Sequence, residues 1–174
     1  SANMDRMIYV DHFPSIGETT VADYEVMHSG GKGANQSICA RKMGSEVYFF
    51  GAVGQDKVGN MLLENFQAYG IDINGVNVTN SNLSGIAYIT IDSKGDNTIL
   101  YVPGANLNAK ASQIPDYFFN ENTVFLIQME INPAENWKLV HKAKERGARV
   151  ILNLAPMKHI PVEIIHSIDV LIMN

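Results

Sequence analysis

The chain has 174 residues, of which 46% are hydrophobic and 18% are charged; this balance is typical of a globular domain with a sizeable core. The formal net charge of −5 argues against a nucleic-acid partner, because binding to phosphates requires a basic surface. A single cysteine, Cys39, cannot form an internal disulfide, which indicates a cytoplasmic protein. We expect neither a membrane-spanning segment nor a signal peptide.

The first part of the chain predicts a loop followed by short strands. Residues 1–5 have loop chemistry, Met7–Val10 is apolar and prone to β structure, and residues 18–27 predict strands exposed on one face. Both ends resemble cuts through a domain, since no strand precedes the first residue and the chain stops directly after the strand-like segment 169–173. We therefore expect an incomplete α/β domain that covers residues 1–174.

A glycine-rich stretch at residues 29–36 (SGGKGANQ) precedes the first predicted helix, which extends from Ala34 to Met43. Glycine permits positive φ and close approach, and a helix that begins there offers free N–H groups to an anionic or hydroxyl-rich ligand. The spacing excludes a P-loop and a dinucleotide fingerprint. Taken alone, the glycines also fit a tight turn with a solvated Lys32. Cys39 lies among apolar residues of this helix, so we expect it to be buried.

The middle of the chain predicts one helix among several β regions. Val47–Phe50 indicates a short buried strand, residues 51–56 a loop, and Lys57–Tyr69 an amphipathic helix ended by a glycine. Two further strands, 86–91 and 98–102, flank a glycine turn and predict a hairpin.

From Val124 onward, strands and helices alternate. A nearly continuous apolar strand at 124–129 precedes helix-start signals at Asn132 and Pro133. Next come a strand at 149–152, a short helix at 162–166 and a strand at 169–173. This order predicts a mostly parallel sheet with helices on both faces, in Rossmann-type layers. The two β segments at about residues 7–29 and 84–104 would then meet in a small second sheet, placed like a lid.

Polar side chains follow the predicted parallel strands, where ligands bind in open α/β sheets. Glu130, Asn153 and Asn174 each end a strand, and Asn3 and Asp5 would take the same position if a further strand preceded them. Carboxylates accept hydrogen bonds and amides both donate and accept, so the set suits a polyol. Each residue alone also fits a solvated loop or a turn. The histidines lack ligand spacing, so we assign no metal to them.

Several motifs together resemble the ribokinase branch of the PfkB carbohydrate-kinase family, and the resemblance covers all 174 residues in order. The motifs are N-x-D (3–5), F-P-x-x-G-E-T (13–19), G-G-K-G-A-N-Q (30–36), G-A-V-G-Q-D (51–56), G-A-N (104–106), Q-x-E (128–130) and N-x-A-P (153–156). The G-G-K-G-A-N-Q form favours the ribokinase branch, because relatives that act on other sugars usually differ there.

The resemblance implies ATP-dependent transfer of phosphate to the 5-hydroxyl of ribose, with Mg²⁺ and, in the full-length protein, a monovalent cation such as K⁺ as a further candidate. It implies a homodimer that forms through the lid. It also implies that Asn174 opens the family's N-x-x-E segment near the nucleotide. The sugar-binding residues that it implies are Asn3, Asp5, Gly31, Lys32, Gly33, Asn35 and Glu130.

The chain departs from the family pattern at its end. The acidic residue of N-x-x-E and the later G-A-G-D motif, which supplies a phosphate-cradling turn and the aspartate general base, are absent from these 174 residues. We therefore expect a sugar-binding half with no catalytic residue and no turnover of its own. Two alternatives stay open: a kinase for another sugar or a nucleoside, whose base would contact Ile86, Tyr88 or Tyr101, and a non-catalytic sugar-binding or dimerising module.

Overall fold

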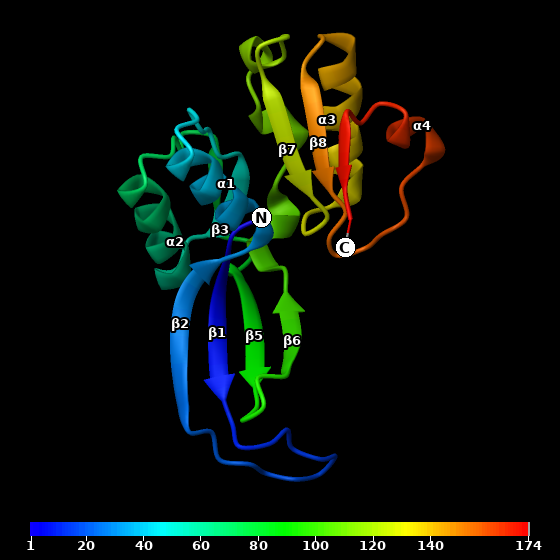
Figure 1. Ribbon diagram of the computed structural model, residues 1–174. Coiled ribbons are helices and arrows are strands. Elements are labelled where there is room, and N and C mark those ends of the chain that lie inside the picture. Colours follow the sequence, from blue (N-terminus) through cyan, green and yellow to red (C-terminus); the bar gives the residue numbers. More distant parts are fainter. Residues whose placement is uncertain (174) are drawn as a thin grey trace.

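The computed structural model describes residues 1–173, in which an α/β part and a four-stranded lid meet near the N-terminus (Figure 1). The helices are α1 (Lys32–Lys42), α2 (Lys57–Ala68), α3 (Pro133–Glu145) and α4 (Val162–Ile165). The strands are β1 (Asn3–Tyr9), β2 (Tyr24–Gly30), β3 (Gly51–Gly54), β4 (Val76–Thr79), β5 (Gly85–Ile91), β6 (Asn97–Val102), β7 (Val124–Gln128), β8 (Arg149–Asn153) and β9 (Val170–Ile172). None of the described helices has the length and apolar character that crossing a membrane requires.

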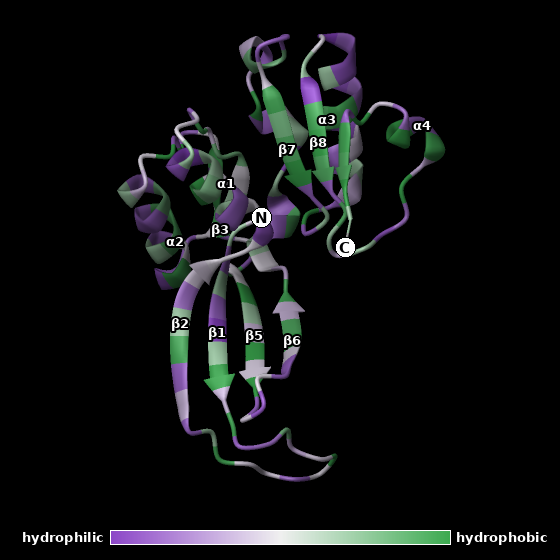
Figure 2. Cartoon of the chain, viewed as in Figure 1, coloured by the Kyte–Doolittle hydropathy of each residue, from purple (hydrophilic) through white to green (hydrophobic). Residues whose placement is uncertain are grey.

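The lid confirms the predicted small sheet. Its strand order is β2-β1-β5-β6, in which β1 pairs antiparallel with β2 and parallel with β5, and β5 and β6 form the predicted hairpin. The lid strands β1 and β2 mix hydrophilic and hydrophobic residues along their length (Figure 2), as expected for a sheet that is not enclosed by helices. Segments more than 70 residues apart in the sequence thus form one surface beside the start of the chain.

The α/β part confirms parallel pairing and flanking helices, with its strands divided between two sheets within residues 1–173. The strands β7, β8 and β9 form one sheet, and β3 pairs with β4 in the other. Helix α3 buries Leu139 and Val140 against Val150 and Leu152 of β8. The other side of β7 is less covered, since Leu126 is 37% exposed. The second core packs α1 and α2 around β3, through residues that include Ala34, Phe49, Val53, Leu62 and Phe66.

Three local expectations are wrong. The predicted loop at residues 1–5 is mostly strand, because β1 begins at Asn3. The segment Val47–Phe50 forms only a bridge between Tyr48 and Asp72, while the predicted loop Gly51–Gly54 is the fully buried strand β3. Cys39 is exposed instead of buried, because α1 directs only Gly33 and Ala34 fully into the core.

Gly31 alone joins the end of β2 to the start of α1. Its φ of 90° lies in the left-handed region that favours glycine. A Cβ at this position would also lie 2.8 Å from the backbone nitrogen of Asn3. The junction is therefore tight for two reasons, and it places the N-terminus of α1 directly beside β1.

Candidate substrate site

The candidate site lies where the lid meets the strand ends of the α/β part, close to the N-terminus marked in Figure 1. Asn3 and Asp5 reach it from β1, Lys32 from the first position of α1, and Glu130 from the turn after β7. Asn3 and Asp5 therefore approach from a lid strand and not, as the sequence suggested, from the end of a preceding parallel strand.

The Glu130 carboxylate is bound by several protein groups, and the residue is only 8% exposed. Its Oε2 accepts hydrogen bonds from the Ser1 hydroxyl at 2.5 Å and from the backbone N–H of Lys32 at 3.0 Å. The Lys32 Nζ lies 3.3 Å from its Oε1. A carboxylate at a helix N-terminus is stabilised by the N–H groups and the dipole. Glu130 thus ties the glycine stretch to the strand-end edge.

Asp5 contrasts with Glu130, because no hydrogen bond within residues 1–173 occupies its carboxylate. The carboxylate lies against Gly30, where an added Cβ would approach Asp5 Oδ2 to 2.0 Å. Burial raises the pKa of Asp5 and the Glu130 charge raises it further, while Lys32 and His28 oppose the shift. Asp5 therefore keeps free capacity to accept hydrogen bonds from a ligand.

Asn3 is fixed by Asn106, a residue whose role the sequence did not predict. Asn106 is fully buried, and its Nδ2 donates to Asn3 Oδ1 at 2.7 Å and to the Ala2 carbonyl at 3.1 Å. Its Oδ1 accepts from the Ala2 N–H at 2.9 Å. One amide thus satisfies the start of β1 and holds the Asn3 side chain in place. The G-A-N motif was the available signal, since its alanine is also fully buried.

The glycines pack closely against the chain's own backbone. A Cβ on Gly33 would lie 2.5 Å from the Ser1 nitrogen, and the Gly33 N–H donates to the Ser1 hydroxyl at 3.1 Å. This close approach lets β1 run beside the first turn of α1. Direct contact of Gly31 and Gly33 with a sugar stays a prediction.

Asn35 is exposed and faces a different part of the site. It borders a pocket of about 390 Å³ between α1 and the strand ends, which Asn153 reaches from β8. The lining residues are Lys32, Asn35, Gln36, Asn153, Ala155, Ile172 and Met173. Lys32 thus stands between this pocket and Glu130. Asn174 lies outside the described residues.

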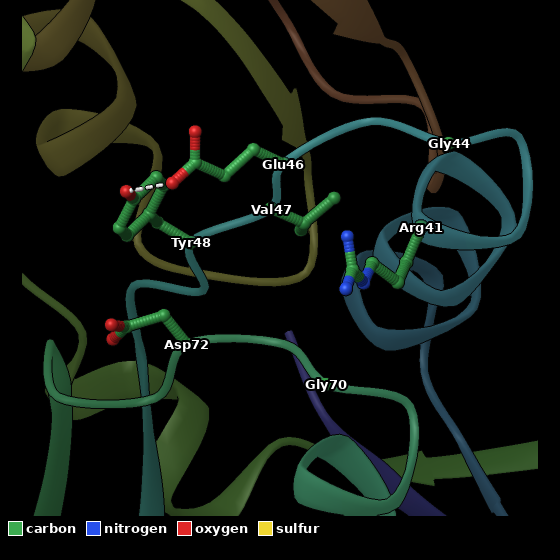
Figure 3. Close-up of a pocket in the computed structure, with 7 residues that line it drawn as sticks. All are labelled: Arg41, Gly44, Glu46, Val47, Tyr48, Gly70 and Asp72. Carbon is green, nitrogen blue, oxygen red and sulfur yellow. Dashed lines mark hydrogen bonds between the residues drawn. The ribbon is translucent and has the colours of Figure 1, made fainter.

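A larger pocket, of about 450 Å³, lies away from these residues, before the start of β3 and β4 (Figure 3). Its polar groups bond to one another or to nearby backbone: Tyr48 donates to Glu46, and Arg41 donates to the Ser45 and Tyr69 carbonyls. None of the predicted site residues lines it. We therefore place the candidate site at the lid and not in this pocket.

Comparison with known proteins shows the family to which the chain belongs. The model of the pfkB family carbohydrate kinases matches residues 1–174. The ribokinase of Haemophilus influenzae is 32% identical over 178 residues, which cover 100% of this chain and 58% of that protein.

Solved structures agree with this match. The ribokinase of Thermotoga maritima superposes with a TM-score of 0.87 at 34% identity, over 98% of this chain and 56% of that one. The Arabidopsis thaliana ribokinase complexed with ribose and ATP gives 0.85 at 33% identity, over 98% and 57%. The chain therefore spans less than two thirds of the length of these relatives. With a family model that matches every residue, the chain belongs to the pfkB family of carbohydrate kinases.

Proposed function

We propose that this chain is the sugar-binding part of an ATP-dependent ribokinase, which transfers phosphate to the 5-hydroxyl of ribose. The observation that carries the proposal is the carboxylate of Asp5, which has no hydrogen-bond partner within residues 1–173 and lies near the charges of the Glu130–Lys32 ion pair. A half-buried acceptor without a protein donor suits a ligand that is rich in hydroxyl groups.

The proposed roles follow from the chemistry of each group. Asp5 accepts hydrogen bonds from sugar hydroxyls, and the amide of Asn3, whose Oδ1 is held by Asn106, donates to the sugar. Lys32 contacts a hydroxyl and meets phosphate charge during transfer, and Glu130 accepts from the sugar while it orients Lys32. The backbone of Gly31 and Gly33 and the side chain of Asn35 complete the proposed sugar site.

We propose ATP with Mg²⁺ as the phosphate donor; a relative at 33% identity is described with ribose and ATP bound. Residues 1–173 contain no group of three or more His, Cys, Asp or Glu side chains arranged to hold a metal. We assign none of the described residues to Mg²⁺. We place the general base and most of the nucleotide contacts outside these 174 residues, apart from Asn174 as the proposed nucleotide contact.

A homodimer through the lid and a cytoplasmic location complete the proposal. The lid leaves large apolar side chains exposed, and Tyr24, Ile99 and Leu100 are each more than half exposed. Such surfaces favour association with another protein surface. Sedimentation equilibrium of the chain, alone and with ribose, measures this directly; a monomer at every concentration would remove the dimer from the proposal.

Isothermal calorimetry of the chain with ribose, fructose and adenosine tests the acceptor. Binding of ribose alone supports a ribokinase, and tighter binding of fructose or adenosine supports a kinase for another acceptor. An assay for ribose-dependent release of ADP from ATP tests the second half of the proposal. We expect no turnover by the 174-residue chain, and clear turnover would show that its own residues suffice for catalysis.

A further inference from the structure

Tyr101 joins the lid to the strand-end edge of the site. It lies on β6, and its hydroxyl donates to the backbone carbonyl of Glu130 at 3.1 Å. Burial raises the pKa of Tyr101, and the charge of Glu130 raises it further, so the hydroxyl stays protonated and able to donate. The bond therefore links β6, an edge strand of the lid, to Glu130, which forms the ion pair with Lys32.

The lid register places Tyr101 opposite Asp5 across one intervening strand. Asp5 pairs with Ala87, and Ala87 pairs with Tyr101. Directly paired residues point to the same face of a sheet, and both Asp5 and Tyr101 interact with Glu130. The two backbones are two strand spacings apart, about 10 Å, and only the methyl group of Ala87 lies between their side chains.

The next pair of this face is equally small. Asn3 pairs with Gly85, so the place beside Ala87 toward the α/β part carries no side chain at all. A Cβ on Gly85 would collide with Asn3 Oδ1 and Asn106 Nδ2, both at 2.3 Å. The face thus has a floor of small residues, with the Asp5 carboxylate on one side and the Tyr101 ring on the other.

We propose that Tyr101 is a positioning and specificity-determining residue of the sugar site: its hydroxyl holds β6 against Glu130, and its ring limits the size of the acceptor that fits beside Asp5. This inference rests on the proposed function for its ligand. The coupling of the lid to Glu130 is independent of the ligand, because the hydrogen bond is made within the protein.

Three variants of the full chain separate the hydroxyl from the ring. Tyr101→Phe removes only the hydroxyl, Tyr101→Ala removes the ring, and Tyr88→Phe is the matched control. Tyr88 lies next to Ala87 on β5 but points to the opposite face, where it pairs with Arg6. It is therefore not placed to contact an acceptor beside Asp5, contrary to the expectation that grouped it with Tyr101 for a nucleoside base. Calorimetry with ribose and fructose gives both affinities, and hydrogen exchange of residues 98–102 and 129–131 reports how firmly the lid is held.

We expect Tyr101→Phe to weaken ribose binding about 3- to 10-fold, as for loss of one neutral hydrogen bond, and to speed exchange in both segments. Tyr101→Ala should raise the ratio of fructose to ribose affinity by about tenfold, since pocket size discriminates acceptors at this level. Tyr88→Phe should change neither affinity by more than about twofold. A ratio unchanged in Tyr101→Ala would overturn the specificity role, because a purely structural loss lowers both affinities together.

Failure of the proposed function looks different. If the unchanged chain binds neither ribose nor fructose, the proposed function and the specificity role are both refuted. The positioning role is then decided by hydrogen exchange alone: faster exchange in Tyr101→Phe than in Tyr88→Phe supports it, and equal exchange overturns it.

Discussion

The candidate site lies between two walls: the lid wall, which includes β1, and the strand-end wall, which includes the turn after β7. Each wall contributes one carboxylate, and the two carboxylates differ in whether protein groups already bind them. Glu130, on the strand-end wall, accepts hydrogen bonds from Ser1 and Lys32 and forms an ion pair with the same lysine. Asp5, on the lid wall, has no such partner within the described residues, and its pKa is raised. A satisfied carboxylate organises its surroundings, whereas an unsatisfied one is available to a ligand. We therefore expect Glu130 to act mainly on the architecture and Asp5 mainly on binding.

The largest expected effect is a loss of stability when Asn106, which binds the start of β1, is replaced. Asn106→Ala leaves the Ala2 N–H and Asn3 Oδ1 without a partner in a buried place, at about 1–3 kcal/mol for each group. We expect a loss of about 2–6 kcal/mol in the free energy of unfolding, measured by urea denaturation. Asn108→Ala is the control, because its buried Oδ1 has no hydrogen-bond partner among residues 1–173. Equal losses in the two variants would contradict the anchoring role.

Removal of the two carboxylates should have contrasting effects, one mainly on ribose binding and the other mainly on stability. Asp5→Ala should weaken ribose binding by about 1.5–3 kcal/mol, the range for hydrogen bonds to charged groups, with little loss of stability. Glu130→Ala should instead lower the free energy of unfolding by about 1.5–3 kcal/mol, because Lys32 and Ser1 lose their acceptor. Calorimetry and urea denaturation of both variants measure the contrast.

Asp11→Ala is the matched control for Asp5, since the Asp11 side chain is 84% exposed and lies far along the lid from Glu130. It should leave both ribose affinity and stability unchanged. If Asp5→Ala keeps full ribose affinity while its fold is intact, Asp5 does not bind the sugar.

Where local pattern and tertiary packing agree, the sequence predicted the fold well. Helix α2 has helical spacing and a terminal glycine, and α3 begins at an Asn132 cap that accepts from the Ala134 N–H at 3.1 Å. Both ends of α2 and the start of α3 were predicted within a residue of their observed positions. The hairpin of β5 and β6 followed from alternating residues around a glycine turn.

The errors occur where contacts distant in sequence decide the local structure. Gly51–Gly54 has weak β propensity, yet it is a buried strand because α2 and the segment around Ser84 pack closely on it; a Cβ on Gly54 would lie 2.6 Å from the Ser84 nitrogen. Asn3 belongs to a strand because it pairs with Gly30 of β2 and Gly85 of β5. Asn106, over 100 residues later, satisfies its side chain. The motifs predict Asp5 and Glu130 as site residues, but no pattern in the sequence shows which of the two carboxylates is already bound by protein groups.

The smallest predicted effect is a gain of stability when Asp5 loses its charge. Burial and the Glu130 charge raise the folded-state pKa of Asp5 above the ordinary 3.8, so the folded protein binds this proton more tightly than the unfolded chain does. The contribution of this proton to the free energy of unfolding is fully present below the pKa of Asp5 in the unfolded chain, and it is lost as the pH rises through the pKa in the folded protein. At neutral pH, Asp5→Asn should therefore be more stable than the unchanged chain, with a higher Tm, and the difference should shrink toward zero as the pH falls below about 4.

Ribose affinity should change in the opposite direction, because protonation of Asp5 removes the hydrogen-bond acceptor. In the unchanged chain the affinity should fall as the pH drops through the raised pKa of Asp5. In Asp5→Asn the affinity should be low and independent of this titration. A Tm difference that stays constant between pH 3 and pH 7 would mean that the charge of Asp5 costs the fold nothing, and Asp5 would then be no more available to a ligand than Glu130.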